Sequence, residues 1–281
     1  MSDSVTYAGT LDMQRATVAF LAGLLEAERA RRATRTGTRA LSPFTQAVLV
    51  VRWFLDATRV ARLAADHDIG VSTAYRYLHE GIDALAAQAP DLRTALDHAQ
   101  QAGTSHLSLD GVVIPTDRCK APGPTKDVDL WWSGKIHGHG GNIQVITLPD
   151  GRPLWTSPVR PGREHDITAA RTHRLIEPLT ALARAGLPTL ADLGYEGEPD
   201  AFILPIKTPK GRELTDDQKT YNKLQRGTRG RGERAHALLI MRFRALRRIT
   251  LDPWCIGRII AAALVLLGHE HDRLIPTAHT A

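Results

Sequence analysis

The stretch that decides the fold is Thr104-Ser-His-Leu-Ser-Leu-Asp-Gly-Val-Val-Ile114, whose alternating and apolar residues are typical of a buried strand. One carboxylate, Asp110, stands inside it between Leu109 and Gly111. Burying a carboxylate that has no partner is costly in free energy. An acid at this place therefore indicates a functional site more than a structural one.

An α/β order follows this first strand. The sequence predicts further strands over 142–148, 154–159, 187–191 and 202–206, a helix over 166–185, and final helices over 230–248 and 254–268. Three strands, a helix, two strands and a long helix is the order of an RNase H-like domain, a mixed sheet flanked by helices. Order alone is weak evidence, because α/β orders recur in unrelated proteins.

The N-terminal part reads as helical. Apolar spacing predicts helices over 11–33, from Pro43, over 60–67, and from an N-cap at Ser72, with Pro90 ending the helical region. The last two helices, joined by a turn containing Gly70, have the pattern of a helix-turn-helix. The fourth helix is expected to bury a stripe and to present three residues to base edges: Tyr75, Leu78, Ile82 and Leu85 inward, Thr73, Arg76 and Tyr77 outward.

These patterns divide the chain into four parts. We expect an N-terminal helix and basic linker over 1–39, a helix-turn-helix domain over 40–100, an RNase H-like catalytic domain over 101–272, and a tail over 273–281.

Composition favours a polyanionic partner. Thirty-six Lys and Arg residues face 30 acids, the net charge is +6 and the pI is about 9.6, although a solubilising basic surface would give the same totals. A group of arginines brackets Glu233 in sequence, where phosphate contacts to double-stranded DNA are expected. The residues that we assign to these contacts are Arg229, Arg234, Arg242, Arg244 and Arg247.

Other classes of protein are disfavoured. Two distant cysteines do not make a disulfide framework or a cysteine-rich zinc site. The apolar runs 18–25 and 259–267 are too short to span a bilayer, and no signal peptide is recognisable. We therefore expect a cytoplasmic protein that is not bound to a membrane.

Two more acids complete the candidate site. Asp192 ends the strand over 187–191, next to the first strand in such a fold, and Glu233 lies near the start of the helix over 230–248. Three converging carboxylates repel one another unless cations lie between them. Oxygen ligands select Mg²⁺ or Mn²⁺, and two such ions would clamp the attacking and leaving oxygens of a phosphodiester. We therefore predict Asp110, Asp192 and Glu233 as metal ligands and catalytic residues.

Several alternatives stay open. Asp127 or Asp129 could replace one member of the triad, although both lie in a loop rich in Pro and Gly. His137 and His139 resemble a zinc-binding pair that lacks further ligands. Asp166 is interpreted as a helix N-cap, and the preceding His165 could orient a carboxylate or contact phosphate.

Taken together, these motifs resemble bacterial insertion-sequence transposases of the DDE superfamily, the group related to the eukaryotic Harbinger elements. The resemblance covers about residues 40–270. It rests on six landmarks: Leu109-Asp-Gly111, Ser133-Gly-Lys-Ile-His137, Asn142-Ile-Gln144, Pro161-Gly-Arg-Glu-His-Asp166, Ala191-Asp-Leu-Gly-Tyr195 and Arg229-Gly-Arg-Gly-Glu233.

The resemblance implies a transposase that cuts the terminal inverted repeats of an insertion sequence and joins the 3′-hydroxyl ends to target DNA. It implies Asp110, Asp192 and Glu233 as ligands of the metal ions, and we expect a homo-oligomer on DNA. Many relatives carry Tyr and Lys seven residues before and after the Glu, where this chain has Arg226 and Ile240. The rival functions are an inactive helix-turn-helix regulator derived from a transposase and a related nuclease with another task.

Overall fold

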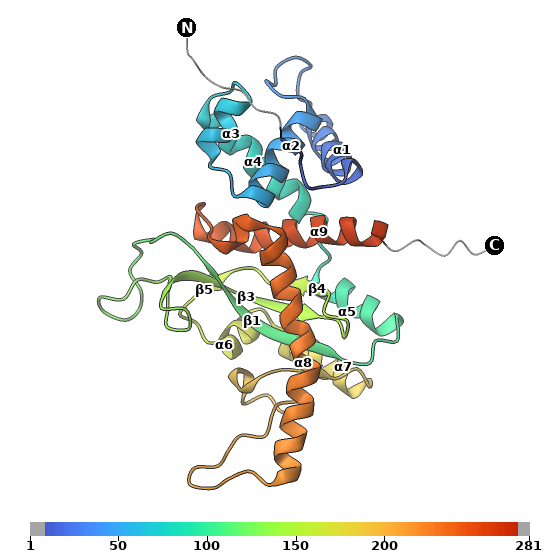
Figure 1. Cartoon of the computed structure of the whole chain (residues 1–281), viewed down its shortest axis with the longest axis vertical. Helices are drawn as coiled ribbons and strands as arrows, with labels where there is room; N and C mark the ends of the chain where they lie inside the picture. Colours follow the sequence, from blue (N-terminus) through green and yellow to red (C-terminus); the bar gives the residue numbers. More distant parts are fainter. Residues whose placement is uncertain (1–8, 275–281) are drawn as a thin grey trace, which may run out of the picture.

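The computed structural model describes the backbone of residues 9–274 and the side chains of residues 9–230 and 237–270. Four helices come first and lie together at one end of the molecule (Figure 1): α1 (Arg15–Arg31), α2 (Pro43–Asp56), α3 (Val60–Asp66) and α4 (Val71–Ala86). Ser42 caps α2 by accepting a hydrogen bond from the Thr45 amide, and Pro43 occupies the first turn, where its missing N–H costs nothing. The four helices predicted for this part are confirmed.

The phase of α4 differs from the prediction. Its N-cap is Gly70, two residues before the predicted Ser72. Leu78, Ile82 and Leu85 are buried as predicted, but Tyr75 and Tyr77 exchange their predicted places. Tyr77 is only 2% exposed, whereas Tyr75 is 41% exposed. The stripe through Ala74, Tyr77, Leu78 and Ile82 follows helical spacing equally well and is the one that packs inward. The predicted outward position of Tyr77 was therefore wrong.

A fifth helix corrects the prediction that helical structure ends at Pro90. Asp91 caps α5 (Leu92–Gln101) by accepting a hydrogen bond from the Thr94 amide, so the proline lies before a helix and not after the last one. α5 packs against the sheet domain, because Ala95, Leu96 and Ala99 share a core with residues of the later strands and helices.

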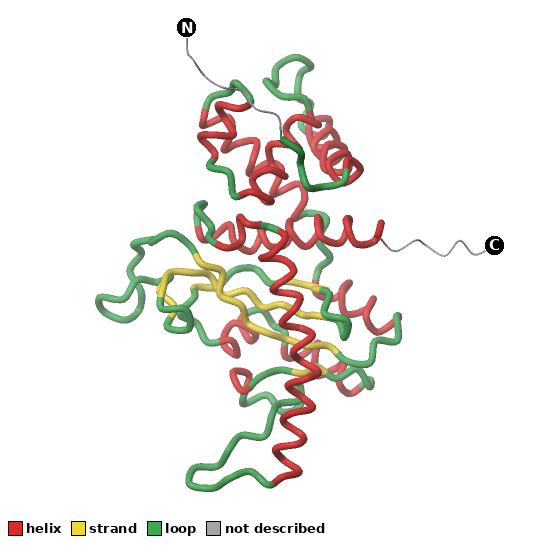
Figure 2. Tube along the Cα trace, viewed as in Figure 1, coloured by secondary structure: helices red, strands yellow, loops and turns green. Residues whose placement is uncertain are grey.

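A mixed sheet forms the centre of the molecule (Figure 2). Its strand order is β2-β3-β1-β6, and β4 and β5 both pair with β3. β1 and β3 are antiparallel, whereas β1 and β6 are parallel. The strands are β1 (Leu107–Pro115), β2 (Trp132–Ser133), β3 (Gly138–Thr147), β4 (Pro153–Thr156), β5 (Arg160–Pro161) and β6 (Thr189–Leu190).

Four of the five predicted strands are confirmed near their predicted places. The fifth, over 202–206, is reduced to one parallel bridge between Leu190 and Ile203. The helix predicted over 166–185 is two helices, α6 (Asp166–Thr172) and α7 (Ile176–Arg184). Arg174, at φ +55°, breaks the helical run between them, and Leu175 is then fully buried.

The long helix α8 (Asp216–Arg242) crosses the sheet and extends beyond it (Figure 1). It begins well before the predicted residue 230, because Thr215 and Gln218 form a capping box. It also ends earlier, at Arg242, and Arg244–Arg247 form a 3-10 turn, η2. The chain closes with the 3-10 turn η3 (Pro253–Cys255) and α9 (Ile256–Leu274).

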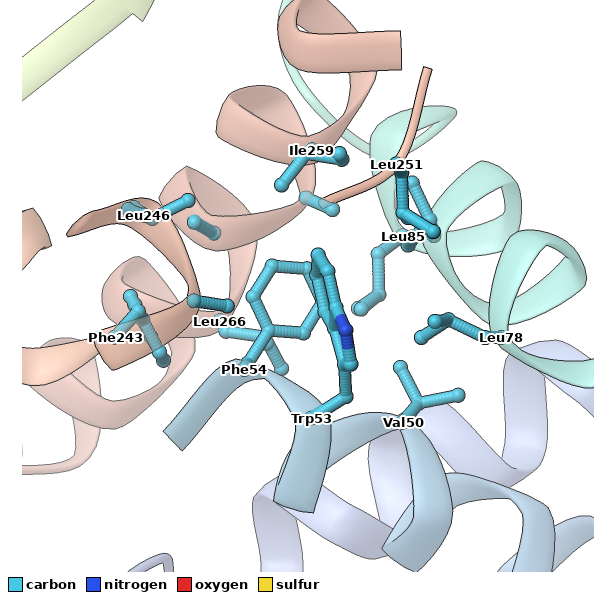
Figure 3. Packing of buried hydrophobic residues seen from close by; sticks show 14 of the residues in the cluster. Val50, Trp53, Phe54, Leu78, Leu85, Phe243, Leu246, Leu251, Ile259 and Leu266 are labelled. Atoms are coloured by element: carbon cyan, nitrogen blue, oxygen red, sulfur yellow. The ribbon is translucent and has the colours of Figure 1, made fainter. Parts of the chain in front are cut away.

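Two cores lie on opposite faces of the sheet. Leu107 and Leu109 of β1 face α5, α6 and α7, while Val112 and Ile114 face α8 and α9. The second of these cores continues into the N-terminal helices (Figure 3): Trp53 and Phe54 of α2 meet Phe243, Leu246, Ile259 and Leu266. The window Pro253–Glu270 is long and apolar enough to cross a membrane, but 56% of it is buried inside the fold. Its apolar residues thus serve the core.

Candidate active site

Asp110 and Asp192 are brought to one place by the pairing of β1 with β6. The parallel register joins Leu107 to Thr189 and Ser108 to Leu190, so continuing it by two residues aligns Asp110 with Asp192 on one face. By alternation this is the face of Val112 and Ile114, which α8 covers. The sequence prediction that these two acids meet is supported by this register.

Burial dominates the electrostatics of Asp110. It raises the pKa of this carboxyl to about 6, and the neighbouring carboxylates of Asp192 and Asp166 add to the rise. The cations of Lys135 and Arg229 oppose it. Among the described residues no group donates a hydrogen bond to the Asp110 carboxylate. A carboxylate held in this way is suited to a cation that arrives from outside.

Asp192 is fixed by the turn in which it lies. It lies two residues after the end of β6 and caps η1 (Leu193–Tyr195), accepting a 2.8 Å hydrogen bond from the Gly194 amide. Its other oxygen lies 3.9 Å from a guanidinium nitrogen of Arg229 on α8. Arg229 is only 17% exposed, so this predicted DNA contact is also the counter-ion of the second aspartate.

The third member of the predicted triad lies on α8, but its side chain is not described. Residues 231–236 belong to the helix, and the side chains of Glu233 and Arg234 lie outside the described part of the structure. Within that part, no three His, Cys, Asp or Glu side chains gather as a metal site. Asp110 and Asp192 supply two carboxylates, the hard oxygen donors that suit Mg²⁺ or Mn²⁺.

A chain of polar contacts that the sequence analysis missed lies on the other face of β1. Tyr195, which is fully buried, donates a 2.6 Å hydrogen bond to Gln144, and Gln144 donates one of 2.9 Å to Asn142. Asn142 donates at 2.8 Å to Asp166, which accepts at 3.3 Å from Lys135. Burial also raises the pKa of Tyr195 well above its ordinary value, so the phenol keeps its proton.

A sequence signal for this chain existed. Asn142 and Gln144 stand two apart in an apolar strand, so they share one face of the sheet. Two uncharged polar residues on a buried face need partners, and they belong to the landmarks quoted above. Asp166 is not the N-cap, as was interpreted, because His165 occupies that position and Asp166 is the first residue of α6.

A cavity of about 530 Å³ opens beside these residues. Lys135, Asn142, Asp166 and His165 line it together with Trp132, Arg163 and Gly194, among others. His165 thus lies on the wall of this cavity, and its contact with phosphate stays a prediction.

The alternative ligands are occupied elsewhere. Asp129 lies 2.9 Å from the ring of His139 and 3.7 Å from Arg118, and together with Asp127 these residues line a second cavity of about 500 Å³. His137 is at a turn with φ +48°. In the described part of the chain neither histidine joins a metal-ligating group, so nothing there favours zinc.

The remaining predicted DNA contacts are dispersed. Thr73 is partly exposed and Arg76 is exposed on α4, and Arg76 donates to the Thr73 hydroxyl at 3.3 Å. Arg244 and Arg247 are exposed on η2. Arg242 forms ion pairs with Asp12 at 2.6 Å and Glu270 at 3.6 Å. Arg242 thus also ties the end of α8 to α9 and to the segment before α1.

Comparison with known proteins gives a family. Residues 109–267 match the family described as a DDE superfamily endonuclease. This range contains Asp110, Asp192 and Glu233, and also the hydrogen-bonded polar residues on the other face of β1, from Tyr195 to Lys135. No curated protein matches.

Two solved structures align over 96% of the chain and 82% of their own. They are the Mos1 transposase paired-end complex with left transposon end, at 9% identity and a TM-score of 0.22, and a pre-cleavage Mos1 transpososome, at 8% identity and 0.19. TM-scores this low do not establish a shared fold.

Proposed function

The chain belongs to the DDE superfamily endonuclease family, and from this premise we propose that it is a DNA transposase. In this proposal it cuts at the ends of an insertion sequence and joins the 3′-hydroxyl ends to target DNA. One observation carries the proposal: two carboxylates from adjacent parallel strands, Asp110 and Asp192, share a face of the sheet beneath α8. The family motifs supply the finer assignment to insertion-sequence enzymes related to Harbinger elements.

The sheet supports an RNase H-like arrangement for this domain. In the order β4-β3-β1-β6, β6 is parallel to β1 and Ile203 is bridged to Leu190, which agrees with the expected adjacency of the first and fourth predicted strands. The early strands are antiparallel and the later ones parallel, as a mixed sheet of this type requires.

Helical spacing supports Glu233 as the third ligand. Asn222, Gln225 and Arg229 contact residues 203–206 and Asp192, and Leu239 is buried against the sheet. Position 233 comes one turn after Arg229, and residues four apart lie on one side of a helix. From this spacing we propose that position 233 lies on the side of α8 that faces the two aspartates.

Asp110, Asp192 and Glu233 would hold Mg²⁺ or Mn²⁺, most simply two ions. When bound, the ions supply activation of a water or hydroxyl nucleophile and offset charge on the leaving oxygen. The protein's own residues keep the ligands in place: the Gly194 amide orients Asp192, and β1 holds Asp110 at the edge of the buried core. Arg229 offsets the charge of Asp192.

DNA contacts complete the proposal. We propose that α3 and α4 form a helix-turn-helix whose exposed first turn, with Thr73, Tyr75 and Arg76, reads the terminal repeat. Arg244 and Arg247 would contact phosphates, and assembly of several copies on DNA belongs to the same proposal.

The test is cleavage of duplex DNA carrying the element ends, in Mg²⁺ and in EDTA. We expect Asp110→Asn, Asp192→Asn and Glu233→Gln each to lower the cleavage rate by at least about a thousandfold while end binding stays within about threefold, since only metal binding needs the charge. EDTA should stop cleavage, and Mn²⁺ or Mg²⁺ should restore it.

Asp200→Asn, on a carboxylate that is 79% exposed, is the matched control and should cut at the wild-type rate. Full activity in one of the triad variants would remove that residue from the site. Sequence-specific binding without cleavage would favour an inactive regulator, and cleavage without strand transfer would favour a nuclease with another task.

A further inference from the structure

Lys135 connects the hydrogen-bonded polar residues on the other face of β1 with the cavity of about 530 Å³, whose wall also includes Gly194, two residues after Asp192. Its ammonium donates hydrogen bonds to the Gly111 carbonyl at 2.6 Å and to Asp166 at 3.3 Å. The side chain is 52% exposed and lines the 530 Å³ cavity. The carbonyl it contacts belongs to the residue directly after Asp110, so this cation is placed next to the catalytic strand.

The groups that hold Lys135 are built into the fold. Asp166 is anchored by Asn142, which also donates to the Glu164 carbonyl at 3.1 Å. A side chain at position 111 would overlap the Asp166 carboxylate, so the glycine of Leu109-Asp-Gly111 lets Asp166 lie directly against β1. Asn142 is buried, and hydrogen bonds between buried polar groups restrict the geometry of the groups that they join.

A contribution to folding stability is a weak explanation for the position of Lys135 at the end of this series of hydrogen bonds. A half-exposed ion pair contributes little to folding, and a lysine loses rotamer freedom when it is held in one place. An ammonium has three N–H donors, and the described contacts with Gly111 and Asp166 use two. The cavity wall is where a further acceptor would be met.

We propose that Lys135 contacts the phosphodiester that is cut and that Asp166 is the positioning residue that holds its ammonium there. The proposal deepens the function proposed above and rests on it. A phosphodiester under attack gains negative charge on its oxygens, and a fixed cation at that place stabilises the transition state more than the ground state. The cavity between Lys135 and Trp132 would then receive the strand that carries this phosphate.

The test measures whether the Lys135 side chain interacts with one particular phosphate, the scissile one. Binding of end DNA is measured in EDTA for wild type and Lys135→Gln, with the scissile phosphate either intact or replaced by an uncharged methylphosphonate. For each protein, the methylphosphonate effect is the factor by which this replacement weakens binding of the DNA. The ratio of the wild-type effect to the Lys135→Gln effect cancels contributions that both proteins share. We expect a ratio of about tenfold, the size of one charge-assisted hydrogen bond. In Mg²⁺, Lys135→Gln should cut about a hundredfold more slowly.

Lys120→Gln removes the same charge from an exposed loop position and should give a ratio near one. Asp166→Asn keeps the shape of the side chain; we expect it to reduce the ratio to about twofold and to have no added effect in the Lys135→Gln background. A merely structural Asp166 would change the thermal midpoint and leave the ratio alone, which would overturn its assigned role.

A ratio near one for Lys135→Gln, in a protein whose wild type binds and cuts the ends, would overturn the contact. If the wild type does not cut DNA at all, the proposed function is wrong, and this inference is wrong with it.

Discussion

The surroundings of Asp110 and its proposed role favour opposite charge states. Burial in the strand favours the neutral carboxyl, whereas a metal ligand must be charged. Without a cation the folded protein holds the Asp110 proton more tightly than the unfolded chain, because burial raises the pKa from 3.8 to about 6. The contribution of Asp110 to stability is therefore largest below about pH 4 and is lost as the pH rises through about 6.

From this shift we predict that the metal-free protein becomes less stable between about pH 4 and pH 6, by at most about 3 kcal/mol from this group. Asp110→Asn should remove that part of the pH dependence and should be more stable than the wild type at neutral pH. Urea unfolding in EDTA at several pH values measures both effects. Asp200→Asn, on an exposed carboxylate, should follow the wild-type curve; an Asp110→Asn curve that did the same would contradict the assigned burial cost.

Single residues were predictable where their chemistry conflicted with their surroundings. Asp110 was predicted as a site residue because it is an acid within an apolar strand. Asp192 was predicted because its strand was expected to lie next to the strand of Asp110. Lys135 and Asp166 escaped because neither is unusual in sequence: one lies in a glycine-rich turn and the other opens a helix. Their importance arises from contacts with Gly111 and Asn142, which only the folded sheet brings near.

Elements were predictable in kind and less so in phase and length. Tyr75 and Tyr77 of α4 fit two different apolar stripes, and the buried Tyr77 ring packs under the guanidinium of Arg39, which lies far away in sequence. The early start of α8 depends on the capping box at Thr215, within a stretch whose polar composition is typical of a loop. The break between α6 and α7, at Arg174, allows Leu175 to reach the core.

For α4 we predict that Arg76 reads one base pair of the terminal repeat. It is exposed beside Thr73 at the start of the helix, where a major-groove contact is made in helix-turn-helix proteins. Arg76→Ala should cost about 1–3 kcal/mol of discrimination at one position of the repeat and little on scrambled DNA. Titrations on matched and scrambled ends at two salt concentrations measure this difference.

Arg244→Ala serves as the comparison for that experiment. Arg244 is exposed on η2, and loss of a phosphate contact should weaken binding to every sequence and lower the salt slope by about 0.9. If Arg76→Ala weakened matched and scrambled DNA equally, α4 would be a general DNA anchor and not the reading helix.

At the scale of the whole molecule, the N-terminal helices and the sheet share one core. α4 packs along α9, and Phe54 of α2 lies edge to face with Phe243, the residue directly after α8 (Figure 3). Ion pairs cross the same boundary, between Arg258 and Asp83 and between Arg242 and Asp12. The predicted boundary near residue 100 stays a prediction, but the two sides of it are held by a continuous apolar layer.

This layer gives the last prediction: the DNA-reading helices and the catalytic sheet unfold together. Phe54 of α2 is fully buried against Phe243, so Phe54→Ala leaves a cavity in the shared core and should cost about 3–5 kcal/mol. Hydrogen exchange should then show the slow amides of β1 and β3 losing protection by the same free energy as those of α2.

Phe44→Ala, on the same helix but 39% exposed, should cost at most about 1 kcal/mol, mainly from the lost contact with Arg15. If β1 and β3 kept their protection in Phe54→Ala while α2 lost it, the N-terminal helices would open independently. The distance between the reading helix and the carboxylates would then be set by a hinge and not by the core.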